Sequence, residues 1–317
     1  MPYKYVIRRF LMALPTAWLV ITFVFVALYI LPGDPVEALV DVERGGVSEE
    51  YLEQLRERMG LNDPPHIRYF KYFGGLLRGD LGTSWKTQRP VTTEIGVRLV
   101  STLSLAVSGV FISLLLGIPL GVLSALNRNK LTDYILTFFS VTGMAAPNFW
   151  MAMLLIYAFA FKIPAFPILG EGDLNEPLEY LRHLVLPALA IGAHSAGLIT
   201  RMTRSSLLEV LRSDYVRTAR AKGCNNRRAV FRHALRNALI PVISMAGLTF
   251  VFLLGGSIVI ESVFAREGLG TLILRGIVDR DAPLLQGTIV VFVLFIILGN
   301  TFVDIIYSVI DPRIVHE

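Results

Sequence analysis

The side chains in this sequence with the clearest potential for chemistry are the cations of one basic segment, Glu209–Pro241. From Arg201 to Arg236 the chain carries ten Lys or Arg residues against two carboxylates, Glu209 and Asp214. Guanidinium groups in such a cluster can pair with acidic groups on another protein. We therefore interpret the segment as a part of the chain that engages a partner protein.

The basic segment is predicted to form two short helices joined at Gly223. Ser213 and Asp214 can accept the free N–H groups at the start of the first helix, and Gly223 stands where a left-handed residue would end it. Asn225 and Asn226 can cap the second helix. Along that helix the apolar residues recur at near 3.6 spacing, and arginines take the other face at i, i+4 and i+8, namely Arg228, Arg232 and Arg236. Pro241 is expected in the first turn of the helix that follows.

No catalytic motif accompanies this segment, so no catalytic residue is predicted. The sequence has no G-x-x-x-x-G-K-[ST] loop that could hold ATP, and neither H-E-x-x-H nor G-x-S-x-G occurs. Cys224 is the single cysteine, so an intrachain disulfide and a thiolate cluster are excluded. The five histidines form no cluster, and no metal site is predicted.

The composition indicates an integral membrane protein. The chain has 317 residues, of which 54% are hydrophobic, and its mean hydropathy is positive. The net charge of +5 is concentrated in a few loops between apolar runs, which follows the positive-inside rule and argues against nucleic-acid binding.

Six apolar runs are predicted to cross the membrane as helices, which gives an all-α fold. The basic N-terminus leads into a run that is too long for a signal peptide and is expected to stay as an anchor. The predicted spans are 10–31, 99–126, 134–161, 184–204, 241–262 and 287–310. The cytoplasmic parts are 1–9, 209–240 and 311–317, and the external ones are 32–98, expected to fold as a helical lid, and 263–286.

Two features of the spans bear on a transport path. Gly117 and Gly121 form a GxxxG spacing that permits close helix approach. The third span is expected to break near Pro147, and broken membrane helices are tolerated mainly where protein or a water-filled path satisfies the freed backbone groups. Polar residues at membrane depth are either path-lining or hydrogen-bonded packing residues. The candidates are Thr142, Pro147, Asn148, His194, Ser195 and Thr249.

The basic segment resembles the coupling loop, or EAA loop, of the membrane subunits of ABC importers, in the form found in the dipeptide, oligopeptide and nickel permeases. Pro32-Gly33-Asp34-Pro35 and Asp311-Pro312-Arg313 resemble the same family at the two ends of the chain. The residues that carry the resemblance in the loop are Tyr215, Arg217, Thr218, Ala219, Arg220, Ala221, Lys222, Gly223, His233, Ala234, Leu235, Arg236, Asn237 and Pro241.

The resemblance implies the type I importer permease fold, with six membrane helices and a folded extracellular loop after the first. It also implies a rigid coupling helix that docks on a separate ATPase, made of Ser213, Asp214, Tyr215, Arg217, Ala219, Arg220, Ala221, Lys222 and Gly223. The alternative is that these cations only set the membrane topology.

The implied partners are a second homologous permease in a heterodimer, two ATPase subunits that carry ATP and Mg²⁺, and an extracellular solute-binding protein. The location is a prokaryotic plasma membrane, with both termini cytoplasmic. Peptide is the first substrate expected, and nickel, glutathione or an oligosaccharide are the alternatives. From another class, an ion-driven carrier would need paired intramembrane carboxylates or inverted repeats, which the sequence lacks.

Overall fold

The computed structural model describes residues 2–30, 36 and 48–310. In this part of the chain every named element is helical, and one isolated bridge joins Thr83 and Pro90. Five helices are long and apolar enough to cross a membrane, and a bent pair of helices raises the number to six if the pair is one span. The motif at 32–35 and the C-terminal 311–317 lie outside the described residues.

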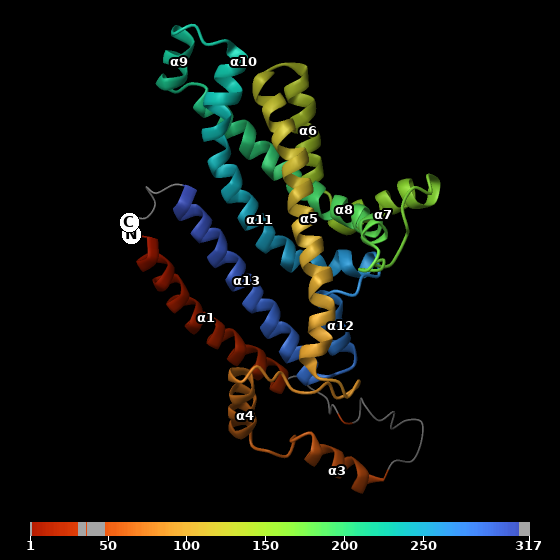
Figure 1. Ribbon diagram of the computed structural model, residues 1–317. Helices are drawn as coiled ribbons and strands as arrows, with labels where there is room; N and C mark the ends of the chain where they lie inside the picture. Colours follow the sequence, from red (N-terminus) through yellow and green to blue (C-terminus); the bar gives the residue numbers. More distant parts are fainter. Residues whose placement is uncertain (1, 31–35, 37–47, 311–317) are drawn as a thin grey trace. The chain divides into compact units, whose positions relative to one another are not determined.

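Figure 1 labels the elements. The long helices are α1 (Pro2–Ile30), α5 (Val91–Leu126), α8 (Pro177–Val210), α11 (Leu235–Val263) and α13 (Ala282–Ile310). The shorter ones are α3 (Glu49–Arg58), α4 (Pro65–Leu77), α6 (Leu131–Ala145), α7 (Asn148–Ile156), the π-helix η2 (Tyr157–Lys162), α9 (Asp214–Ala221), α10 (Asn226–Arg228), the π-helix η3 (Ala229–Ala234) and α12 (Leu269–Val278).

The chain forms two compact units. The first takes in residues 103–266 with the beginning of α1 and the end of α13, and the second takes in 8–102 and 267–298.

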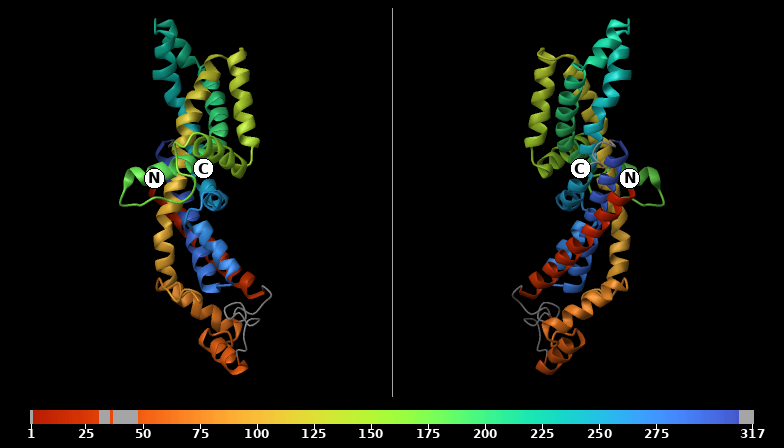
Figure 2. Two further views of the ribbon diagram at one scale, coloured as in Figure 1. Left: turned by 90° about the vertical axis from the view of Figure 1, so that its right-hand side faces the viewer. Right: turned by 90° about the vertical axis from the view of Figure 1, so that its left-hand side faces the viewer.

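In the first unit α8 is the central helix and packs against α6, α7 and α11. Its buried residues, such as Leu186 and Ile191, share a core with Leu105 of α5 and Leu253 of α11. Figure 1 and both views of Figure 2 show α9 and α10 (teal) at one end of α8 and α11. The membrane-spanning helices of this unit thus carry the basic segment at their end.

Glycines allow α5 and α8 to approach closely. A Cβ atom added at Gly117 would lie 2.6 Å from Cβ of Ile199, and one added at Gly121 would lie 2.5 Å from Cβ of Thr203. Both distances are far below van der Waals contact, so these positions accept only glycine at this separation. The GxxxG spacing therefore lies at a helix–helix crossing.

The helix pair α6 and α7 bends by 105° between Ala145 and Asn148. Ala146 has the extended backbone, φ −72° and ψ 131°, that a residue before proline favours. Pro147 then occupies the position before the first turn of α7, where its missing N–H costs nothing. The break falls where the sequence predicted it.

In the second unit aromatic contacts join α1 to α4. Phe25 packs edge-on against Tyr69 at 5.3 Å between ring centroids, and Thr22 shares a 2.8 Å hydrogen bond with the Tyr69 hydroxyl. Phe25 also stacks on Tyr72, and burial raises the pKa of the Tyr72 phenol above its ordinary value. Ser48 caps α3 by accepting a hydrogen bond from the Tyr51 N–H.

The stretch 263–286, expected as an external loop, contains α12 and the start of α13. Leu269 and Leu272 of α12 pack with Val91 and Ile95 of α5, so this short run gains its stability from tertiary burial. The carboxylate of Asp281 is fully buried, accepts a hydrogen bond from the Ser84 hydroxyl and caps α13 at the Leu284 N–H.

Candidate coupling site and membrane cavity

The basic segment folds as a helical hairpin whose first arm is α9. Gly223 ends this arm with φ +86°, the left-handed conformation that the sequence predicted. The Gly223 N–H donates to the Arg220 carbonyl at 2.9 Å, and the Cys224 N–H donates to the Ala219 carbonyl at 3.1 Å. These bonds satisfy carbonyls that the helix end leaves free, so α9 is a closed, rigid unit of eight residues.

The predicted cap at the other end of α9 is corrected. Ser213 does occupy the N-cap position with extended backbone, but its side chain makes no capping bond. Its hydroxyl instead donates to the Val210 carbonyl at 2.6 Å, which ties the turn to the end of α8. The Asp214 carboxylate lies 3.6 Å from the Arg217 guanidinium and remains on the surface.

Val216 fastens α9 to the membrane helices. It is the one buried residue of this helix and has no exposed surface. It belongs to an apolar cluster with Val122 of α5, Leu207 of α8 and Ala238 of α11. Because three long helices contribute to this cluster, α9 is packed against all of them.

Two polar contacts reinforce this attachment. The Asn237 side-chain amide donates to the Tyr215 hydroxyl at 2.8 Å, which joins α9 to α11. The Ser206 hydroxyl of α8 donates to the Ala238 carbonyl of α11 at 2.9 Å. The two arms of the hairpin and α8 are therefore held in one arrangement at this end of the bundle.

The remaining faces of α9 are open to solvent. Arg217, Arg220 and Lys222 are exposed, and Tyr215 has 45% of its surface exposed. The exposed surface of α9 is thus a basic face that also carries part of the Tyr215 ring. Such a face fits a complementary acidic groove.

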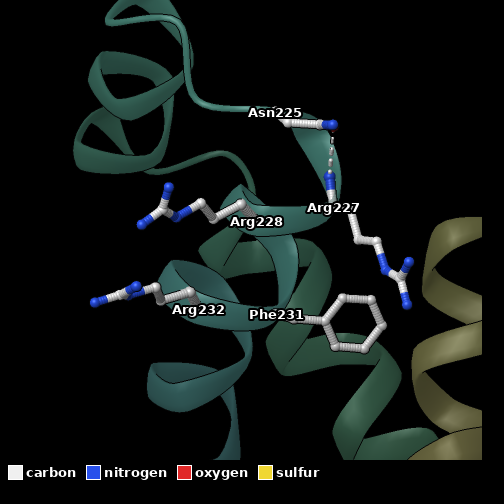
Figure 3. A pocket seen from close by; sticks show the side chains of 5 residues that line it. All are labelled: Asn225, Arg227, Arg228, Phe231 and Arg232. Carbon is white, nitrogen blue, oxygen red and sulfur yellow. Dashed lines mark hydrogen bonds between the residues drawn. The ribbon is translucent and has the colours of Figure 1, made fainter.

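The second arm begins at Asn225, whose side-chain oxygen accepts a hydrogen bond from the Arg227 N–H at 3.2 Å (Figure 3). The chain then runs through α10, η3 and α11 with adjoining bounds. The expectation that Pro241 starts a new helix is corrected, since Pro241 lies inside α11. Ala234, Ala238 and Val242 are all fully buried at successive turns, so one packed face continues past the proline.

A buried ion pair that the sequence did not reveal lies beside the hairpin. Arg204 of α8 donates from Nε to Oδ1 of Asp133 at 2.8 Å and from Nη2 to Oδ2 at 2.7 Å. The Ser124 hydroxyl of α5 also donates to this carboxylate, as does the Asn129 N–H at 3.0 Å. The Asp133 side chain is 4% exposed. One carboxylate thus joins α5, α6 and α8 just before the basic segment begins.

Three of the six predicted path residues line one cavity of about 300 Å³ between α8 and α11, with Met144 of α6 at its edge. They are His194, Ser195 and Thr249. The Thr249 hydroxyl donates to the Met245 carbonyl at 2.8 Å, whereas Nδ1 of His194 is buried and has no hydrogen-bond partner within the described residues. An unpaired imidazole nitrogen beside a cavity is available to a visiting polar group.

The other three path candidates are not part of this cavity. Thr142 and Pro147 are exposed on the bent helix pair. Asn148 begins α7, and its Oδ1 atom is buried without a partner in the part of the chain that the structure describes. Within the described residues no group of three or more potential metal ligands occurs.

Comparison with known families covers almost the whole chain. Residues 117–316 match the family "Binding-protein-dependent transport system inner membrane component". Residues 2–106 match the family "Binding-prot-dependent transport system membrane comp, N-term".

Individual relatives align along their full length. The oligopeptide transport system permease protein AppB of Bacillus subtilis is 39% identical over 314 residues, which are 98% of each chain. The glutathione transport system permease protein GsiC of Salmonella typhimurium is also 39% identical, over 99% of each chain. The dipeptide transport system permease protein DppB of Alkalihalophilus pseudofirmus is 36% identical over 98% of each chain.

Among solved structures, the inward-facing MetNI methionine ABC transporter has a similar chain, with a TM-score of 0.57 and 20% identity over 69% of this protein and 97% of that chain. This similarity supports the all-α permease fold. The two family matches and the full-length relatives show that the protein belongs to the inner membrane components of binding-protein-dependent transport systems, the permease subunits of ABC importers.

Proposed function

We propose that this permease forms half of an inward path for peptides and that α9 couples the path to separate ATPase subunits. The chain is a multi-pass membrane transport component and not an enzyme. A permease of this family works with ATPase and solute-binding partners. The observation that carries the proposal is the attachment of the exposed helix α9 to three membrane helices through Val216.

The peptide substrate is supported by the relatives. The names of these relatives give oligopeptides, dipeptides and glutathione as the transported substrates, and all of these are peptides or peptide-like. Nickel and oligosaccharides, the other substrates expected for this fold, appear in none of these three names. Glutathione, which is itself a small peptide, is the second candidate, because GsiC is as similar as AppB.

The coupling role is assigned to residues 213–223, in which Arg217, Arg220 and Lys222 face acidic groups of the ATPase. A short helix that ends at Gly223 and is anchored by Val216 keeps its orientation relative to the membrane helices when the ATPase subunits move against it. ATP and Mg²⁺ are bound by the ATPase subunits, which move α9 as they close.

The path is assigned to the cavity with His194, Ser195 and Thr249. The second half of the path comes from a homologous permease in a heterodimer, and two ATPase subunits and one extracellular solute-binding protein complete the importer. The protein is placed in a prokaryotic plasma membrane with both termini and the α9 hairpin in the cytoplasm, as the excess of cations in that hairpin supports.

Uptake measurements test the substrate. Cells in which this chain has been deleted are compared with complemented cells for uptake of labelled dipeptide, oligopeptide, glutathione, nickel and an oligosaccharide. We expect uptake of at least one peptide to depend on the chain. Loss of nickel or oligosaccharide uptake alone, with every peptide unaffected, would contradict the proposal.

A further inference from the structure

The second arm of the hairpin borders a groove that is basic at one end and apolar at the other. Its basic end is a hollow of about 700 Å³ with cationic and polar walls. Its lining residues are Tyr215, Arg232, His233, Arg236, Asn237, Ile240 and Ile243. The composition of the lining thus changes from arginine to isoleucine as α11 passes into its apolar part.

Ile243 also lines a second hollow, of about 410 Å³, further along α11. The walls of this hollow are almost entirely apolar and include Phe250 of α11 and Phe302 and Val303 of α13. Phe302 has 63% of its surface exposed and Ile243 has 42%, so the walls are accessible on this chain. Ile243 lines both hollows, so they adjoin along α11, and together they are called the groove.

The cations at the basic end have no acidic partner. Within the described residues no carboxylate lies at salt-bridge distance from Arg232 or Arg236. Figure 3 shows the guanidinium groups of Arg228 and Arg232 on the same side of their helix, with Arg227 and Phe231 on the other. The arginine spacing of i, i+4 and i+8 therefore produces a cationic side that continues to the start of the apolar groove.

The length of the apolar part of the groove matches one leaflet of a bilayer. Ten residues separate Ile240 from Phe250, which is about 15 Å along a helix and about half of a 30 Å hydrocarbon core. Arg236 lies one turn before Ile240 and just outside the predicted span 241–262, where basic residues favour the headgroups. A ligand of this groove needs an anionic head and an apolar tail of leaflet length.

We propose that the groove formed by Arg232, Arg236, Ile243 and the apolar walls of α11 and α13 binds an anionic phospholipid. The phosphate accepts hydrogen bonds from the two guanidinium groups, and one acyl chain follows Ile240, Ile243 and Phe250. Of the residues that line the groove, Tyr215 is also assigned to ATPase coupling on α9, whereas Arg232, Arg236 and Ile243 are not. The lipid stabilises the second arm of the hairpin where that arm enters the membrane.

The test is native mass spectrometry of the purified assembly that contains the full chain, after reconstitution with equal amounts of phosphatidylglycerol and phosphatidylcholine. We expect retained phosphatidylglycerol on the unmodified protein. The double variant R232Q/R236Q should weaken this binding about thirtyfold, because each arginine near an anionic headgroup contributes about fivefold. The matched control is R128Q/K130Q, which removes two exposed cations from the loop between α5 and α6 and should retain the lipid.

A second variant tests the apolar part. Ala246→Leu adds bulk in the groove while it leaves both arginines in place, and it should lower the retained phosphatidylglycerol. Equal lipid retention by R232Q/R236Q and R128Q/K130Q would overturn the proposal in favour of a diffuse attraction between basic loops and the membrane. Absence of phospholipid from the unmodified assembly would also overturn the proposal. A cross-link between position 243 and another subunit would then show that protein covers the groove.

Discussion

Arg204 of α8 holds Asp133 of α6 by two hydrogen-bonded contacts, 2.8 Å from Nε to Oδ1 and 2.7 Å from Nη2 to Oδ2. The pair lies at the end of α8 that leads into the α9 hairpin. Through it, and through the Ser124 hydroxyl of α5, the ends of three helices are joined. In the proposed coupling, this contact is the route by which movement of the hairpin reaches α6 and then α7.

Loss of this ion pair is expected to loosen the bundle. Asp133→Asn leaves the arginine without its counter-charge and should lower the unfolding free energy by about 2 to 3 kcal/mol. This is less than for a fully buried pair, because Arg204 keeps 30% of its side chain exposed. The midpoint of thermal unfolding in detergent measures the effect. The exchange Asp133→Arg with Arg204→Asp should recover part of the loss.

Arg201→Gln is the matched control, since Arg201 is an exposed arginine on the same helix. If this change lowers the midpoint as much as Asp133→Asn does, the ion pair has no special role.

Close approach of α5 and α8 depends on Gly121. The methyl group of Gly121→Ala would meet Cβ of Thr203 at 2.5 Å and the Thr200 carbonyl at 2.6 Å. We expect a loss of about 1 to 3 kcal/mol, because a packed helix pair must separate to admit the methyl group. The yield of folded protein and its thermal midpoint report this loss. Gly255→Ala is the control, as nothing lies within 4 Å of its Cβ position, and an equal effect there would argue against a steric cause.

Cys224, the only cysteine, reports the side of the membrane that the hairpin faces. It lies directly after the residue that closes α9 and is partly exposed. A thiol reagent that does not cross membranes should label Cys224 in inside-out vesicles and leave it unlabelled in intact cells. Labelling in intact cells would place the hairpin outside, where no ATPase is present. Cys224→Ser supplies the background signal.

His194 is expected to contact the transported solute. Its buried Nδ1 atom has no partner among the described residues, and one hydrogen bond to a passing peptide contributes about tenfold at most. His194→Ala should raise the peptide concentration for half-maximal uptake by up to about tenfold while the protein level stays constant. His183→Ala removes a histidine outside the cavity and should have no such effect. Unchanged uptake by His194→Ala would leave this residue a packing role only.

Some features of the fold and the site could be predicted because they depend on local chemistry. The left-handed Gly223, the cap at Asn225 and the break at Pro147 each follow from one residue type at one position. His194 and Thr249 line one cavity, and their place in a transport path stays a prediction.

Features that depend on distant partners could not be predicted in this way. Serine is a common capping residue, yet the Ser213 hydroxyl donates to the Val210 carbonyl of α8 instead. Pro241 is a residue type that favours the start of a helix. Burial of Ala238 and Val242 on both sides of it instead stabilises α11 as one continuous helix. Asp133 finds its partner 71 positions away, and no pattern in the sequence marks that pairing.

The most direct test of coupling through α9 is a comparison of two proline variants. Ala219→Pro removes an internal N–H from α9 and breaks it, whereas Asn226→Pro places proline at the first position of α10, after a residue whose ψ of 143° already suits it. Peptide uptake and ATPase co-purification are measured for both proteins at equal membrane levels. We predict that Ala219→Pro abolishes uptake and weakens ATPase association while Asn226→Pro retains both; normal uptake by Ala219→Pro would contradict the coupling role of α9.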